Sequence, residues 1–167
     1  MARRRNALVL VLCGFTACAT HKIEVAIAPT VVGIPIDDPK AKTLSAAFYR
    51  PAGEGPFPVV VLLSGCFGVR FDAGIVERAN ASYLREGVAT LVLDSFTPRG
   101  IEEVCSDQKL NFDSVAFRVK DSYAAVAWLA GQPMVDASRI YLQGYSHGAV
   151  TARSSVVVGS RARHRSR

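Results

Sequence analysis

The sequence has few aromatic residues and carries no cofactor motif. Aromatic residues make up 8% of the 167 residues, yet half of the chain is hydrophobic, so an aliphatic core is available and wholesale disorder is excluded. Its His, Cys, Asp and Glu residues do not cluster at metal-ligand spacing, and no G-x-G-x-x-G sequence opens a helix after a strand. We therefore predict neither a metal nor a dinucleotide cofactor. The length allows one ordinary domain.

The central part of the chain also has no excess of positive charge, although the net charge is +6. Eight of the 20 basic residues lie near the two ends, which leaves 12 basic residues against 14 acidic ones. This distribution argues against a nucleic-acid partner, because a binding face would need basic residues within the folded part. The eight terminal residues are Arg3, Arg4, Arg5, Arg153, Arg161, Arg163, Arg165 and Arg167.

Residues 1–20 have the features of an export signal. Three arginines precede an apolar stretch, residues 7–12, that is too short to span a bilayer. The sequence Phe15-Thr16-Ala17-Cys18 then resembles a bacterial lipobox, in which Cys18 would be lipidated, although Phe15 stands where leucine is usual. Ordinary cleavage after Ala17-Cys18-Ala19 is the alternative. We expect an exported protein that is either periplasmic or a lipoprotein anchored in the membrane through Cys18.

Alternating strand and helix patterns predict an α/β domain over residues 43–150. Residues 21–42 contain three prolines and are expected to form a tether with at most an irregular edge strand. Residues 59–63 are continuously apolar, which is typical of a central parallel strand covered on both faces. The alternation predicts a mostly parallel sheet with flanking helices. We expect strands at 42–51, 59–63, 88–93 and 139–143, and helices at 73–86 and 113–130.

The last predicted strand leads into a G-x-S-x-G sequence, Gly144-Tyr145-Ser146-His147-Gly148. After a buried strand this spacing is typical of a nucleophile elbow, where the serine sits at a strained strand-to-helix turn. Glycine at both flanking positions lets neighbouring backbone approach closely. An ordinary glycine-rich turn is the alternative reading. The preceding strand and the predicted parallel sheet favour the elbow, with Ser146 as the nucleophile.

The order of several motifs resembles the dienelactone hydrolase branch of the α/β-hydrolases. These motifs are Ser64-Gly65-Cys66 after one strand, Asp94-Ser95-Phe96-Thr97-Pro98-Arg99-Gly100 after the next, Cys105 in the following loop, a helix with Arg118-x-x-Asp121, and the G-x-S-x-G sequence. The resemblance covers residues 43–150. It implies the N-terminal part of an α/β-hydrolase fold, with the later strands missing. Two departures are that the family's namesakes use a cysteine nucleophile, and that Ser64-Gly65 stands in place of His-Gly.

The resemblance also implies a reaction. Ser146 would attack a small ester or thioester to form an acyl-enzyme, which water then hydrolyses. The backbone N–H groups of His147 and of Cys66 or Phe67 would stabilise the oxyanion. A peptidase or lipase of the same fold is an alternative, and so is a non-catalytic lipoprotein or vestigial fragment.

The acid and base of a catalytic triad are missing from the sequence after Ser146. The fold places them after the nucleophile, yet the last 21 residues contain no Asp or Glu. We expect His147 to pack or to line the pocket, and His164 to be a solvated residue of a basic tail. Residues 151–167 form an atypical basic tail, whose sequence resembles the product of out-of-frame translation or of a truncated gene. These features predict an N-terminal fragment of an exported hydrolase that is inactive or nearly so.

Three further expectations concern residues near the predicted strand ends. Cys66 and Cys105 fall in loops at the same edge of the sheet, so they form either a disulfide or two separate thiols. Asp94 is expected to hydrogen-bond within its own loop. Arg118 and Asp121, three positions apart on one helix, are expected to form an ion pair.

Overall fold

The computed structural model describes residues 28–165, and side chains as far as residue 157. The predicted export signal, with Cys18, and the first part of the predicted tether lie outside the described residues. Within residues 28–165, no helix has the length and apolar character needed to cross a membrane. The elements are β1 (Thr30–Pro35), β2 (Thr43–Tyr49), β3 (Phe57–Leu63), α1 (Gly68–Phe71), α2 (Ala73–Arg85), β4 (Ala89–Asp94), the 3-10 helix η1 (Thr97–Arg99), α3 (Gln108–Ala130), β5 (Val135–Gly144) and α4 (His147–Arg165).

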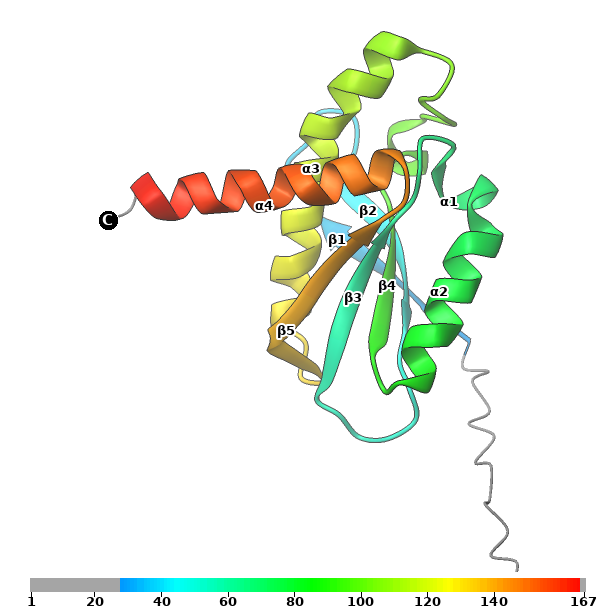
Figure 1. Ribbon diagram of the computed structural model, residues 1–167, viewed down its shortest axis with the longest axis vertical. Helices are drawn as coiled ribbons and strands as arrows, with labels where there is room; N and C mark the ends of the chain where they lie inside the picture. Colours follow the sequence, from blue (N-terminus) through cyan, green and yellow to red (C-terminus); the bar gives the residue numbers. More distant parts are fainter. Residues whose placement is uncertain (1–27, 166–167) are drawn as a thin grey trace, which may run out of the picture.

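The strands form one mixed sheet in the order β1-β2-β4-β3-β5 (Figure 1). Strand β3 is parallel to both of its neighbours, β4 and β5, because helices connect these strands. Strands β1 and β2 are joined by a short connection and pair antiparallel, and β2 pairs antiparallel with β4. The predicted α/β class is confirmed. Because these three strands are parallel, the carboxyl ends of β3, β4 and β5 lie at the same edge of the sheet.

Both faces of β3 are buried, as its continuous apolar sequence predicted. Val59, Val61 and Leu63 belong to a core cluster that also contains residues of α3 and α4. Val60 and Leu62 belong to a second cluster on the other face, beneath α2. Figure 1 shows the corresponding layers, with α2 on one side of the sheet and α3 on the other.

Strand β1 is more regular than expected from its prolines. It pairs residue by residue with β2, from Thr30 to Pro35. Pro35 is the last residue of the strand and Pro29 precedes it, so neither proline interrupts the ladder. The proline-rich composition of residues 21–42 therefore marks the ends of a strand in the described part of this segment.

Helix α3 begins earlier than predicted, and helix α4 continues into the predicted tail. Helix α3 begins at Gln108, because the side chain of Asp107 accepts a hydrogen bond from the Leu110 N–H at 2.9 Å and caps the helix. Helix α4 runs to Arg165, through the residues that were predicted to be an atypical tail. Figure 1 shows the second half of α4 extending past β5, which is the edge strand of the described sheet.

Candidate active site

Ser146 lies in a strained turn between β5 and α4. Its φ of +49° makes it the one non-glycine residue with a positive φ in the described part of the chain. Such a conformation costs about 1–3 kcal/mol for a residue with a side chain and persists where the surrounding structure fixes it. The strained strand-to-helix turn that the G-x-S-x-G pattern predicts is therefore present, with the serine immediately before the first residue of α4.

The two glycines of the pattern are required by close backbone packing. A Cβ atom on Gly144 would lie 2.1 Å from the carbonyl carbon of Gly148. A Cβ atom on Gly148 would lie 2.2 Å from the carbonyl oxygen of Leu63 and 2.5 Å from that of Ser64. The start of α4 is thus pressed against the end of β3. Alanine at either position would force these backbone segments apart and would disturb the turn that holds Ser146.

The loop after β3 lies against Ser146. A Cβ atom on Gly65 would be 3.6 Å from the Cβ of Ser146, and the N–H of Tyr145 donates to the Leu63 carbonyl at 3.2 Å. In the described part of the chain, the backbone N–H groups of Cys66 and His147 have no hydrogen-bond partner. The structure therefore brings together the two segments that carry the predicted oxyanion donors, and leaves both donors free.

The side chain of His147 is buried against α3 and is fully engaged there. Its Nε2 is 2.7 Å from the carbonyl oxygen of Asn111, and its Nδ1 is 2.5 Å from Nη1 of Arg118. Since a carbonyl only accepts, we assign the proton to Nε2, and Nδ1 then accepts from Arg118. Burial lowers the pKa of His147; the Asn111 carbonyl opposes this and the charge of Arg118 adds to it. The ring is therefore neutral and packed, and neither nitrogen is free to act as a base.

No side chain among residues 28–157 hydrogen-bonds to the hydroxyl of Ser146. Asp94, at the end of β4, accepts hydrogen bonds from the N–H groups of Phe96 at 2.9 Å and Thr97 at 3.0 Å, as expected for a residue that caps its own loop. The side chain of His164 lies beyond the described side chains. The described part of the chain thus supplies a candidate nucleophile and oxyanion donors without a paired base.

A disulfide joins Cys66 to Cys105, which is 39 residues away in the sequence. The N–H of Val104 also donates to the carbonyl of Cys66 at 2.9 Å. The sequence had left two separate thiols as the alternative. The oxyanion loop, which we define as residues 64–67, is therefore tied to the segment between η1 and α3.

The predicted ion pair between Arg118 and Asp121 is wrong. Asp121 accepts two hydrogen bonds from Arg99, each at 2.8 Å, while Arg118 donates to the carbonyl of Ser64 at 2.7 Å and to His147. The two residues share α3, but their side chains bind different partners. Spacing along α3 could not reveal the competing partner on η1, which lies 22 residues earlier in the sequence than Asp121.

The sequence analysis also missed Asp72. Its carboxylate accepts a hydrogen bond from the N–H of Gly65 in the oxyanion loop. Asp72 stands at the N-cap position of α2 but makes no side-chain capping bond to that helix. An aspartate just before a helix is ordinarily a cap, so the sequence alone offers no signal for this longer-range contact.

Comparisons with known proteins place the fold. No family model matches the sequence, and no curated protein matches it. A dienelactone hydrolase from Anabaena variabilis is 18% identical with a TM-score of 0.57, over 77% of this chain and 57% of that one. A dienelactone hydrolase-like promiscuous phosphotriesterase from metagenomic libraries is 23% identical with a TM-score of 0.59, over 77% of this chain and 54% of that one. A thermostable carboxylesterase from a metagenomic library is 19% identical with a TM-score of 0.57, over 81% of this chain and 42% of that one.

These similarities show that the chain has an α/β-hydrolase fold. The solved structures that it resembles are dienelactone hydrolases and related α/β-hydrolases. The chain spans between 32% and 57% of the length of the solved structures that it matches.

Proposed function

We propose that this protein is a serine hydrolase of the dienelactone hydrolase type, which acts on a small carboxylic ester or thioester through an acyl-enzyme at Ser146. The geometry of the turn carries this proposal. Ser146 has the strained φ of a nucleophile elbow, and two unbonded backbone N–H groups lie on the segments that meet beside it. A fold by itself does not define an activity, so the proposal rests on this site.

In the proposed reaction the Oγ of Ser146 attacks the carbonyl carbon of the substrate and loses its proton to a base. The carbonyl oxygen becomes an oxyanion, which the N–H groups of Cys66 and His147 stabilise. The alcohol or thiol then leaves with a proton, and water hydrolyses the acyl-enzyme to release the acid and restore the serine. Helix α4 begins at His147, so the positive end of its dipole also lies next to the developing negative charge.

No side chain among residues 28–157 is paired with Ser146, so we assign no residue as the base of this step. A serine hydroxyl is a weak nucleophile unless a base accepts its proton, and in this fold the acid and histidine follow the nucleophile in the sequence. His147 is engaged by Asn111 and Arg118. A reagent with a very good leaving group is therefore the sharper probe of Ser146.

We expect an alkyl fluorophosphonate to form a covalent adduct at Ser146, because fluoride is a good leaving group and the phosphoryl oxygen can occupy the oxyanion site. Mass spectrometry of proteolytic peptides would locate the adduct. Ser146→Ala should abolish it, whereas Ser106→Ala, which removes the hydroxyl of an exposed serine, should leave it unchanged. Turnover of p-nitrophenyl acetate should be slow, since no side chain among residues 28–157 is paired with Ser146 as a base, and it should follow the same order. Absence of any adduct at Ser146 in the folded protein would favour the non-catalytic alternative.

We also propose that the protein is exported and attached to a membrane through a lipid on Cys18. The basic, apolar and lipobox-like segments of residues 3–18 support this, and the disulfide is of a kind that persists in oxidising compartments. Cells grown with radiolabelled palmitate should incorporate label into the wild type and into Cys13→Ala, and none into Cys18→Ala. Equal labelling of all three, or an unlabelled mature chain that begins at residue 20, would exclude the lipid on Cys18.

A further inference from the structure

We infer that Arg118 is a positioning residue whose guanidinium holds the two candidate oxyanion donors in place by binding the oxyanion loop and the side chain of His147 at the same time. This inference rests on the proposed function, because the donors matter for catalysis only if Ser146 is a nucleophile. Arg118 makes no contact with Ser146 itself. It would therefore act through the backbone of the residues that flank the nucleophile.

One guanidinium bridges the end of β3 and the start of α4. Nη2 of Arg118 donates to the carbonyl of Ser64 at 2.7 Å, and Nη1 donates to Nδ1 of His147 at 2.5 Å. Ser64 stands two residues before Cys66, and His147 directly follows Ser146. The planar guanidinium presents its donors in a fixed fork, so the two bonds together constrain the distance between these segments.

The peptide plane next to the Cys66 donor is held at both ends. The carbonyl of Ser64 and the N–H of Gly65 belong to the same planar peptide unit. Arg118 binds its carbonyl, and the carboxylate of Asp72 accepts from its N–H. Rotation of this plane would turn the following peptide, which carries the N–H of Cys66. Arg118 and Asp72 thus fix the direction in which the first donor points.

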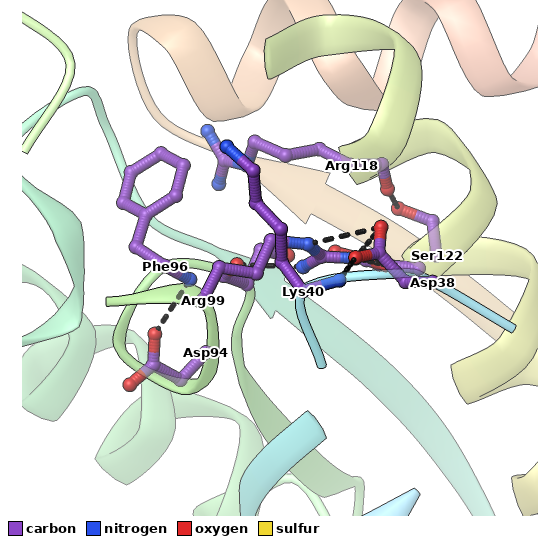
Figure 2. Close-up of polar contacts among 9 residues, drawn as sticks. Asp38, Lys40, Asp94, Phe96, Arg99, Arg118 and Ser122 are labelled. Carbon is purple, nitrogen blue, oxygen red and sulfur yellow. Dashed lines mark hydrogen bonds and ion pairs between the residues drawn. The ribbon is translucent and has the colours of Figure 1, made fainter. Parts of the chain in front are cut away.

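The placement of Arg118 is difficult to explain by stability alone. Its side chain is buried, with 1% of the residue exposed, and its Nε has no hydrogen-bond partner. No carboxylate among the described residues forms an ion pair with it, since Asp121 binds Arg99. The guanidinium carbon lies 4.8 Å from the centre of the Phe96 ring, and Figure 2 shows the side chain reaching toward that ring. Burial lowers the pKa of Arg118 to about 10.

A buried charge without a partner costs several kcal/mol. A residue that served packing alone would be better replaced by an apolar side chain of similar volume. The hydrogen bonds of the guanidinium go to Ser64 and His147, which lie on the two sides of the candidate active site. This juxtaposition is the reason for assigning Arg118 a positioning role.

Ester turnover by Arg118→Met is expected to show a kcat about tenfold to 100-fold below the wild type, with KM little changed. Misplaced donors remove stabilisation that exists in the transition state, and displacements of about 1 Å have effects of this size. Arg118→Lys should recover part of kcat, because an ammonium group can still donate to the Ser64 carbonyl. Turnover of p-nitrophenyl acetate at a temperature where each variant is fully folded measures this.

Ser122→Ala is the matched control for this experiment. The Ser122 hydroxyl is buried on α3 and donates to the backbone carbonyl of Arg118 at 2.9 Å, so its loss perturbs the same helical turn and leaves the guanidinium in place (Figure 2). It should retain the wild-type kcat. A kcat in Arg118→Met equal to that of Ser122→Ala, or a change confined to KM, would overturn the inference.

Amide NMR spectra separate this inference from the proposed function. Arg118→Met should shift the backbone amide signals of Cys66 and His147 together and leave that of Leu129, about three turns further along α3, unchanged. Asp72→Ala should shift the signals of Gly65 and Cys66 and leave that of His147 unchanged. If the wild type has no turnover that depends on Ser146, the proposed function fails, and the spectra still decide the positioning. An unmoved Cys66 signal in a folded Arg118→Met would then reject it.

Discussion

Replacing Asp121 with alanine is expected to lower the free energy of unfolding by about 3 kcal/mol, because it removes two charge-assisted hydrogen bonds from a buried guanidinium. The two carboxylate oxygens of Asp121 accept from the two terminal nitrogens of Arg99, each at 2.8 Å. Both side chains are 2% exposed. After the substitution the guanidinium would keep Asp38, at 3.1 Å, and the carbonyl of Ser95, at 2.7 Å.

The size of this effect follows from what the pair connects. Asp38 lies between β1 and β2, Arg99 on η1 and Asp121 on α3, so one guanidinium joins three segments that are distant in the sequence. Figure 2 shows Arg99 and Asp38 side by side. Arg99 also lies over the ring of Phe117, with 4.5 Å between the guanidinium carbon and the ring centre. Since a domain is stable by about 5–15 kcal/mol in total, the loss would be a large part of it.

Urea unfolding followed by circular dichroism would measure the change. The control is Asp113→Ala on the same helix, which breaks an ion pair with Lys109 whose side chains are 86% and 52% exposed. An exposed pair contributes little, so this variant should lose less than about 0.5 kcal/mol. Equal losses for the two variants would show that burial does not set the strength of the Asp121 pair.

The parts of the fold that the sequence predicted are those decided by local patterns. The apolar run of β3 predicts a strand that is buried on both faces, and the alternation along β2 predicts a strand that is buried on one face. The structure shows both patterns. The turn at Ser146 depends on two glycines whose missing Cβ atoms would overlap backbone. The sequence patterns that indicate these features each lie within a few residues, so they can be recognised before the fold is known, even though Gly148 packs against the distant Leu63.

The contacts that the sequence did not predict depend on competition between distant partners. Arg118 and Asp121 are neighbours on a helix face, but Arg99 binds Asp121 more favourably, in a bidentate pair. Asp72 has the position of a helix cap and instead binds Gly65. The packing of the His147 ring was expected, but its partners on α3 were not. In each case the deciding group becomes visible only when the sheet has brought separate segments together.

Reduction of the Cys66–Cys105 disulfide is expected to lower the free energy of unfolding by about 4 kcal/mol. The two cysteines are 39 residues apart, and a cross-link over a loop of that length removes this much chain entropy from the unfolded state. Urea unfolding with and without a phosphine reductant would measure the difference. The Cys66→Ala, Cys105→Ala double variant should have the lower stability and should not respond to the reductant.

The same bond should influence the candidate active site, because Cys66 carries one of the two free N–H donors. The disulfide and the hydrogen bond from Val104 tie this residue to the segment between η1 and α3. Reduction under conditions where the protein stays folded should therefore slow the fluorophosphonate reaction at Ser146, in the wild type and not in the double variant. A wild type with two free thiols by mass after export, or with unchanged stability under reductant, would contradict the disulfide and remove its support for the oxidising compartment.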